Sequence, residues 1–140
     1  MSTPLKTYDP SKVILTFLGA IAHGYADGTF VTAKRSTDAY DDMAGADGEV
    51  TRIRVLNEMG DVELVLTQTS TFNDVLASQL ALGTVGALLL KDLSGSTLCS
   101  ADQAWIKKAP DAAFGKELNT RTWTLRCAHL VMFVGGIVGS

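Results

Sequence analysis

Alternation of apolar and polar residues dominates the chain and predicts mainly β-strands. In residues 13–18 both faces of an extended segment are largely apolar, which favours a central or covered strand. The pair Asp27-Gly28 is typical of a tight turn between antiparallel strands, because glycine tolerates a positive φ without steric cost. We therefore expect residues 29–35 to return as the antiparallel partner of residues 13–18.

A second hairpin is predicted further along the chain. Residues 50–56 and 61–67 flank a turn at residues 57–60, and every other residue from Val62 to Leu66 is apolar. This spacing predicts a half-buried sheet.

The remaining strand signals lie in the second half of the chain. A short apolar strand is predicted at residues 87–92. A long hairpin follows, in which residues 104–109 precede Pro110 and residues 121–133 return.

Residues 71–82 interrupt the alternation with apolar residues at helical spacing. Ser70 or Thr71 can act as the N-cap, and Gly83 supplies a stop signal. We expect a helix of about three turns that covers an open sheet face or barrel mouth. The chain as a whole is predicted to form one β-rich domain, a sandwich or a barrel, with this helix.

Charge and hydropathy exclude two classes of partner. Twelve basic residues against 15 acidic ones give a net charge of −3, so no basic field exists to hold a phosphate backbone.

Residues 1–12 lack the apolar segment of a signal peptide. The apolar tail at residues 130–138 is about half the length of a membrane-spanning helix. We expect no membrane anchor.

The stretch at residues 36–50 is rich in carboxylates but does not have the spacing of an EF-hand calcium loop. An EF-hand that starts at Asp38 would place Tyr40 at a ligand position and Met43 where glycine is required, so the spacing fails. An irregular calcium site is an alternative to a solvated surface loop. The acids are Asp38, Asp41, Asp42, Asp47 and Glu49.

No catalytic, cofactor-binding or metal-binding residue is predicted. His23 and His129 lie on different predicted hairpins without a carboxylate at ligand spacing. Cys99 and Cys127 lack CxxC spacing and are expected to be reduced thiols. The chain contains no P-loop, GxGxxG or GxSxG pattern. We predict that the protein is not an enzyme; one that uses His129 with an unseen partner is an alternative.

Two basic residues on the predicted second hairpin have two interpretations. Arg52 and Arg54 share one strand face, with Glu63 expected across the hairpin. The face is either a solvated charged surface or a contact with the acidic stretch of a neighbouring copy.

Three features together resemble a known family. They are "GADGEVTR" at residues 45–52, "LTQTSTFNDVLASQL" at residues 66–80, and a long β return that ends in an apolar, glycine-rich tail. Over essentially its whole length the chain resembles the tail tube proteins of contractile-tailed bacteriophages, a phage structural protein family. It is also similar to the tube proteins of type VI secretion and of phage-tail-like bacteriocins.

The resemblance implies a mainly β (α+β) fold over residues 1–140, with two packed antiparallel sheets that form a β-barrel or sandwich and one flanking helix. It further implies hexameric rings that stack into the inner tail tube, a conduit for DNA ejection. Implied partners are further copies of the chain, the tail sheath, the tape-measure protein, and baseplate and tail-terminator proteins. DNA would be met only in transit, and no cofactor is implied. The protein would reside in the virion after assembly in the host cytoplasm.

The resemblance also assigns roles to residues. We hypothesise that the acidic connection at residues 36–49 is an arm that protrudes from the barrel, is disordered when alone, and contacts the next subunit or ring. Asp61 and Glu63 are expected to face the bore. Lys34 and Arg126 are candidates for pairs between subunits. The predicted contact residues are Asp38, Tyr40, Asp41, Asp42, Met43, Asp47, Glu49, Arg52 and Arg54.

A different class of function stays open at this point. In a small-ligand-binding β-barrel, Trp105, Trp123 and Phe114 would line a cavity instead of belonging to an ordinary core.

Overall fold

A computed structural model describes residue 5 and residues 8–136 of the chain. Parts of the N-terminal segment and of the apolar tail considered above lie outside the described residues, namely residues 1–4, 6–7 and 137–140. In chain order the elements are the 3-10 turn η1 (Pro10–Lys12), β1 (Val13–Phe17), β2 (Ala20–Ile21), β3 (Val31–Arg35), β4 (Tyr40–Ala44), β5 (Val50–Arg54), β6 (Gly60–Thr67), α1 (Phe72–Leu82), β7 (Gly86–Asp92), β8 (Leu98–Lys108), β9 (Thr120–Cys127) and β10 (Val131–Phe133). The predicted mainly β class with one flanking helix is confirmed.

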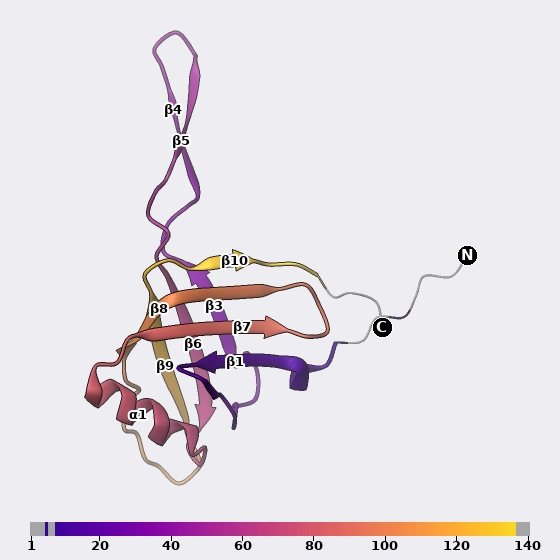
Figure 1. The fold of residues 1–140 in the computed structure, drawn as a ribbon, viewed down its shortest axis with the longest axis vertical. Coiled ribbons are helices and arrows are strands. Elements are labelled where there is room, and N and C mark those ends of the chain that lie inside the picture. The colour runs from indigo at the N-terminus through magenta and orange to yellow at the C-terminus, as the bar shows by residue number, and fades with distance from the viewer. Residues whose placement is uncertain (1–4, 6–7, 137–140) are drawn as a thin grey trace.

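The strands form two antiparallel sheets. The larger sheet has eight strands in the order β2-β1-β7-β8-β9-β6-β3, with β10 paired to β8, and the smaller sheet consists of β4 and β5. The first half of β8 pairs with β7 and β10, whereas its second half pairs with β9. Figure 1 shows that β1, β7, β8 and β10 lie along one axis and that β6 and β9 cross them, so the sheet folds over on itself like a sandwich.

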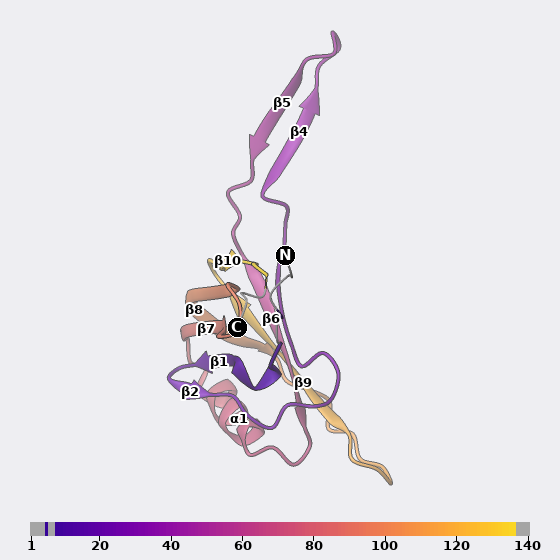
Figure 2. The same cartoon turned by 90° about the vertical axis from the view of Figure 1, so that its right-hand side faces the viewer.

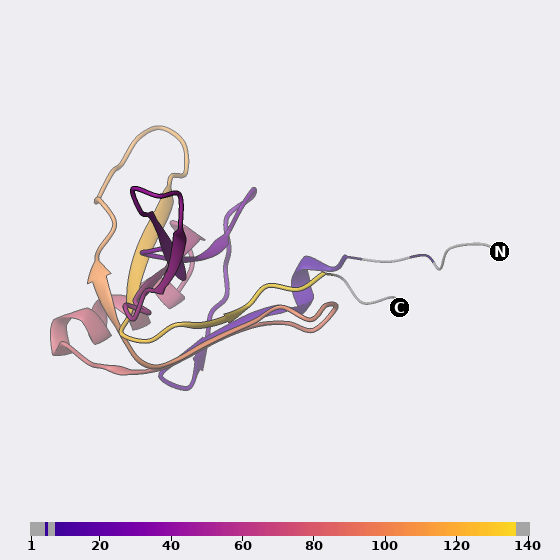
Figure 3. The same cartoon turned by 90° about the horizontal axis from the view of Figure 1, so that it is seen from above.

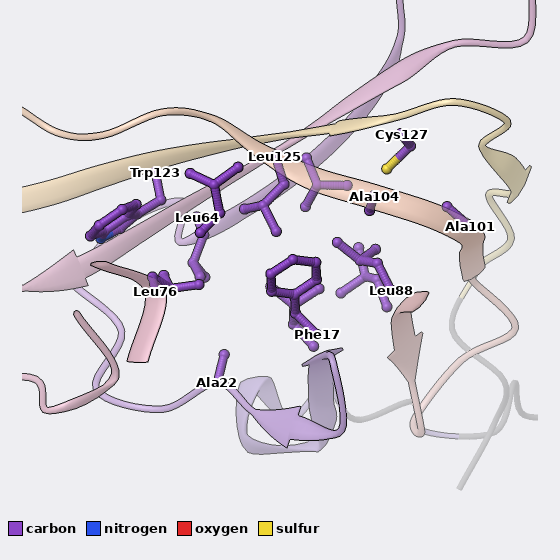
Figure 4. Close-up of a cluster of buried hydrophobic side chains, with 14 of the residues drawn as sticks. Phe17, Ala22, Leu64, Leu76, Leu88, Ala101, Ala104, Trp123, Leu125 and Cys127 are labelled. Carbon is purple, nitrogen blue, oxygen red and sulfur yellow. The ribbon is translucent and has the colours of Figure 1, made fainter. Parts of the chain in front are cut away.

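The inner side of the folded sheet holds the hydrophobic core (Figure 4). Alternate residues of β6 point inward and are fully buried, as the period of two predicted: Val62, Leu64 and Leu66. Trp123 and Leu125 of β9 meet them from the neighbouring strand. Burial of each such side chain contributes about 1.5–3 kcal/mol, so this core is the main source of stability.

Helix α1 lies against one end of the body, where the sequence predicted it (Figure 1). Thr71 is the N-cap, and the hydroxyl of the preceding Ser70 accepts a hydrogen bond from the Phe72 backbone N–H at 3.3 Å. Gly83 ends the helix in the left-handed conformation, with φ at 65°. Phe72 and Leu76 bury the inner face of the helix in the core.

The predicted pairing of residues 13–18 with residues 29–35 is wrong. Strand β1 turns back at once into β2, because Leu18 and Gly19 adopt φ values of 54° and 82°, the pair of positive values that a two-residue hairpin turn uses. On its other side β1 pairs with β7. The later glycine turn leads instead into β3, which pairs with β6.

The predicted hairpin between residues 50–56 and 61–67 is also wrong. Strand β5 pairs with β4, and β6 pairs with β3 and β9. The acidic segment at residues 36–49, predicted as a loop, therefore contains one strand of a hairpin. Gly48 adopts a φ of 89° at its tip, and the Gly45 N–H donates to the Glu49 carbonyl at 2.6 Å.

Two further details complete the sheet. The return predicted over residues 121–133 is interrupted at residues 128–130, so it forms β9 and then β10 along the same side of β8. Residues 22–26 connect β1 with β6, which lie near opposite ends of the sheet. The Ala22 N–H donates to the Leu15 carbonyl in β1, and the Ala26 N–H donates to the Val65 carbonyl in β6. Within the described chain β3 has a paired strand on one side only.

Candidate assembly surfaces

Strands β4 and β5 form a two-stranded ribbon that projects far from the body (Figures 1 and 2). Every residue from position 36 to position 54 is exposed. The ribbon and its base carry all the residues predicted to contact another subunit: Asp38, Tyr40, Asp41, Asp42, Met43, Asp47, Glu49, Arg52 and Arg54. The fold thus gathers them on one protruding element.

The pairing register divides the ribbon into two sides, because directly paired residues point to the same side. Asp42 pairs with Arg52 on the charged side, where the Arg52 guanidinium lies 4.5 Å from the ring centre of Tyr40. The other side, called here the Met43 side, consists of two pairs: Asp41 with Ile53 and Met43 with Thr51.

The ribbon has little of its own to hold it in place. An isolated two-stranded hairpin is marginally stable in water. Four of its large apolar side chains are exposed: Tyr40, Met43, Val50 and Ile53. A structure of this kind gains stability when another surface covers it.

The outer side of β3, β6 and β9 is polar and is called here the charged face. Lys34 Nζ lies 3.0 Å from Glu63 Oε1, and Arg126 Nη1 lies 3.2 Å from Asp61 Oδ1. The remaining outward positions are mostly threonines: Thr32, Thr122 and Thr124. Asp61 and Glu63, predicted to face the bore, both belong to this face.

The pairing of Glu63 with Arg52 and Arg54 across a hairpin, predicted from the sequence, is wrong. Glu63 lies on β6 in the body, where Lys34 of β3 neutralises it. Arg54 instead approaches Glu58 at 3.9 Å, at the base of the ribbon. The two arginines are therefore part of the ribbon, separate from the charged face.

The sequence did not predict a second exposed surface, which we call the apolar face. It is the outer side of β10, β8, β7, β1 and β2. Its exposed apolar residues are Val131, Phe133, Leu98, Leu89 and Ile21, each between 40% and 62% exposed. The sequence signal for it was that residues 13–15 and 87–90 are apolar at every position, so that one set had to point outward.

The cysteines and histidines predicted to lack a catalytic role differ in burial: both thiols are buried, whereas both imidazoles are exposed. Burial raises the pKa of Cys99, and burial followed by the nearby Asp61 carboxylate raises the pKa of Cys127 to about 11. Both histidines are exposed; His129 Nδ1 lies 4.0 Å from Glu58 Oε2. Among the described residues, no group of three His, Cys, Asp or Glu side chains is placed to hold a metal ion.

The three aromatic residues considered for a ligand cavity do not share one. Trp123 is buried in the core, and its Nε1–H donates to Asn73 Oδ1 at 2.9 Å. Phe114 is 77% exposed under the Arg121 guanidinium, and Trp105 borders a shallow hollow beside α1. The alternative in which all three residues line one ligand cavity is therefore not borne out.

An apolar cleft of about 470 Å³ lies elsewhere, between β3 and the ends of β7, β8 and β10. Its lining includes Val31, Leu90 and Met132. Strand β3, which has one open edge in the described chain, forms one wall of this cleft. Within the described part of the chain, no helix has the length and apolarity that crossing a membrane requires.

Comparison with known proteins adds a relative and a shared fold. The structural protein ORF10 of Pseudomonas phage KPP10 is 30% identical over 149 residues, which cover 97% of this chain and 86% of ORF10. No protein-family model matches the chain. Among solved structures, the anti-feeding prophage cap, a tube-terminating cap, aligns with a TM-score of 0.59 at 10% identity and covers 95% of each chain.

A second solved structure is the sheath–tube complex of the extracellular contractile injection system PVC in its extended state. The alignment has a TM-score of 0.57 at 12% identity and covers 94% of this chain and 93% of the other. The sheath/tube terminator of the same system gives 0.53 at 11% identity, over 95% and 99%. At these identities the likeness shows a shared fold alone.

Proposed function

Since this chain belongs to the family of the phage structural protein ORF10, we propose that it is the tail tube protein of a contractile-tailed bacteriophage. Copies form hexameric rings, and the rings stack into the inner tube through which DNA leaves the capsid. A tail sheath binds outside, and a tape-measure protein fills the bore during assembly. Baseplate and terminator proteins close the two ends. The fold shared with tube-terminating and sheath–tube proteins supports this role.

The observation that carries the proposal is the ribbon. It projects from a body with its own core, and its large apolar side chains are uncovered. A protein that works by assembly gains from such an element, because a neighbouring copy completes it. The ribbon residues that the sequence singled out, from Asp38 to Arg54, are the proposed contacts between subunits.

We assign the lining of the bore to the charged face. Its acids are neutralised within the same chain, Asp61 by Arg126 and Glu63 by Lys34. Exposed threonines add polar groups without charge. A wall of this kind does not hold a passing phosphate backbone, because tight non-specific binding requires several cations that release counterions.

Removal of the ribbon tests the proposal directly. The Val55 N–H donates to the Ala39 carbonyl at 2.9 Å at the base, so a Gly-Gly link between Ala39 and Val55 replaces residues 40–54 without stretching the body. We expect the wild-type protein to form rings or tubes at micromolar concentration in electron micrographs and sedimentation. The shortened variant should keep its unfolding temperature within a few degrees and remain monomeric.

Two controls make the result clear. Tyr40→Ser and Met43→Ser alone leave the ladder of the ribbon intact and should weaken assembly only in part. Normal tubes from the variant that lacks residues 40–54 would contradict the role of the ribbon. A monodisperse monomer of the wild-type protein under all conditions would contradict the tube itself.

The proposed bore has its own test. Assembled tubes incubated with a short DNA duplex near physiological salt should not retain it, since counterion release at the neutralised wall is small. The paired variant Asp61→Asn/Glu63→Gln frees two cations on the same face and should raise retention. Strong binding by wild-type tubes would exclude a passive lining.

A second candidate is a terminating ring that caps a tube of other subunits. Two of the solved structures named above are a tube-terminating cap and a sheath/tube terminator. Electron microscopy separates the two roles, because a tube protein grows into long polymers whereas a terminator stops at a ring. A tube of a secretion or bacteriocin device would also polymerise, and a sheath gene beside a capsid gene in the genome would distinguish the phage.

A further inference from the structure

The apolar face is organised in two rows that cross the strands. One row runs from Phe133 through Leu98 and Lys91 to Ile14, and each neighbour in it is a directly paired residue. The second row runs through Val131, Ser100, Leu89, Thr16 and Ile21 in the same way. Directly paired residues point to one side, so both rows lie on the outer surface of the sheet.

This face is unusual for the exposed side of a sheet in water. Its side chains are mostly large and apolar, and Lys91 is the one charged residue in the two rows. The charged face on the other half of the same sheet shows the ordinary composition, with threonines and ion pairs. A contiguous exposed apolar surface of this kind marks a contact site.

The Met43 side of the ribbon has matching chemistry. Met43 and Ile53 provide apolar contact, and Asp41 provides one carboxylate on the same side. The ribbon leaves the body at the end opposite α1 and extends away from it, so it does not reach the apolar face of its own chain (Figures 1 and 2). Figure 3, seen from above, shows the layer of β7, β8 and β10 running to one side of the body. Its outward apolar side chains are exposed there.

We propose that the apolar face receives the Met43 side of the ribbon from a second copy of this chain, with Asp41 of that ribbon beside Lys91. The inference rests on the proposed tube function and adds which surfaces meet. The contact is one sheet packed face to face on another. It covers the exposed apolar residues of both elements and brings opposite charges together.

The geometry of this contact also makes it propagate. The ribbon and the apolar face are different patches of one chain, so each copy that uses its ribbon still has an open face. Except where two copies exchange ribbons reciprocally, such a contact does not close as a two-fold dimer does. It generates a ring or a continuing polymer, depending on the rotation between copies.

Cysteine cross-linking tests the contact, because both native thiols are buried and protonated. In the variant Met43→Cys/Leu89→Cys, a short bismaleimide should link different copies and give a ladder of multimers on a denaturing gel. The matched control is Asp42→Cys/Leu89→Cys, which shifts the thiol to the charged side of the ribbon. We expect at least several-fold less cross-linking from the control.

A charge exchange provides an independent readout that does not alter the core. Asp41→Lys and Lys91→Asp should each raise the concentration needed for assembly roughly two- to fivefold, and the double variant should recover most of this loss. Asp42→Lys, on the charged side, should not be rescued by Lys91→Asp. All of these variants change exposed side chains, so folding is preserved.

The outcomes separate the inference from the tube function. Wild-type tubes with equal cross-linking in the two cysteine pairs, or with no rescue by the charge exchange, would overturn this contact and leave the tube role standing. A wild-type protein that never assembles would overturn both. Selective cross-linking together with rescue would support the contact.

Discussion

Arg126 of β9 places Nη1 3.2 Å from Asp61 Oδ1 of β6, and the two side chains are only 19% and 16% exposed. On the same face the Lys34–Glu63 pair is much more open, at 54% and 38%. The two pairs therefore have similar chemistry and face the same proposed bore, but they differ in their access to water.

Removal of the two cations should have different effects on stability. Arg126→Ala leaves the partly buried Asp61 carboxylate without its donor, and we expect a loss of about 1–3 kcal/mol in the free energy of unfolding. Lys34→Ala removes an exposed partner and should cost at most about 1 kcal/mol. Urea denaturation of dilute monomer measures both, and equal losses would contradict the assigned difference in burial.

Gly24 and Gly28 form a matched pair for a second prediction. Both have positive φ, at 75° and 86°, but a Cβ at Gly24 would overlap the Ser70 side chain, whereas a Cβ at Gly28 meets nothing within 4 Å. Gly28→Ala should therefore cost about 1–2 kcal/mol from backbone strain alone. Gly24→Ala should cost clearly more, because Ser70 holds the His23 carbonyl at 2.8 Å and the first N–H of α1.

Thermal unfolding of the two alanine variants gives the comparison. The expected order is wild type, Gly28→Ala and then Gly24→Ala, in falling order of unfolding temperature. Equal destabilisation would mean that Ser70 moves aside without cost and does not fix the start of the helix.

Asn73 connects helix α1 to the sheet through both ends of its amide. Its Oδ1 accepts from Trp123 Nε1 at 2.9 Å, and its Nδ2 donates to the carbonyls of Thr67 and Ser70, each at 3.0 Å. Asn73→Leu removes all of these bonds and leaves the indole N–H unsatisfied, so we expect a loss of about 2–4 kcal/mol. Asn73→Asp keeps the acceptor and should lose less.

Urea unfolding followed by the combined fluorescence of Trp105 and Trp123 measures the loss. The control on the same helix is Ser78→Ala, whose hydroxyl donates to the Asp74 carbonyl at 2.9 Å on the exposed surface. We expect a change below about 0.5 kcal/mol there. A loss for Ser78→Ala as large as that for Asn73→Leu would show that the helix, and not its link to Trp123, determines the result.

The local elements of this fold could be predicted from the sequence. Periods of two and 3.6 residues are properties of neighbouring residues, so β6 and α1 were found with nearly the observed bounds. Pairing partners could not be predicted in the same way. Leu18-Gly19 and Asp27-Gly28 both allow a turn, and the structure places the hairpin at the first of them, where a leucine has a positive φ.

The candidate surfaces show the same division. The acidic segment could be singled out by composition, but its pairing with residues 50–54 depends on contacts that no local pattern reveals. The apolar face escaped prediction because Leu88, Leu89 and Leu90 are chemically alike. Only the sheet shows that Leu89 points outward while its neighbours are buried.

Cys127 and Cys99 should make the folded protein less stable in alkali. Burial raises the pKa of the Cys127 thiol from 9.0 to about 11, and burial also raises that of Cys99. The folded state therefore keeps these protons when the unfolded chain releases them. The stabilisation is fully present below pH 9 and is lost as the pH rises from about 9 to 11, because deprotonation then favours the unfolded chain.

The double variant Cys99→Ala/Cys127→Ala isolates this contribution. Burial also raises the pKa of Tyr25, which adds to the alkaline loss in both proteins, so the measured quantity is the difference between them. We expect the stability of the wild type to fall more steeply than that of the variant between pH 9 and 11 in urea titrations. A thiol reagent at pH 8 should label both cysteines only after unfolding. Parallel curves, or rapid labelling of the native protein, would show that water reaches the two thiols in the folded core.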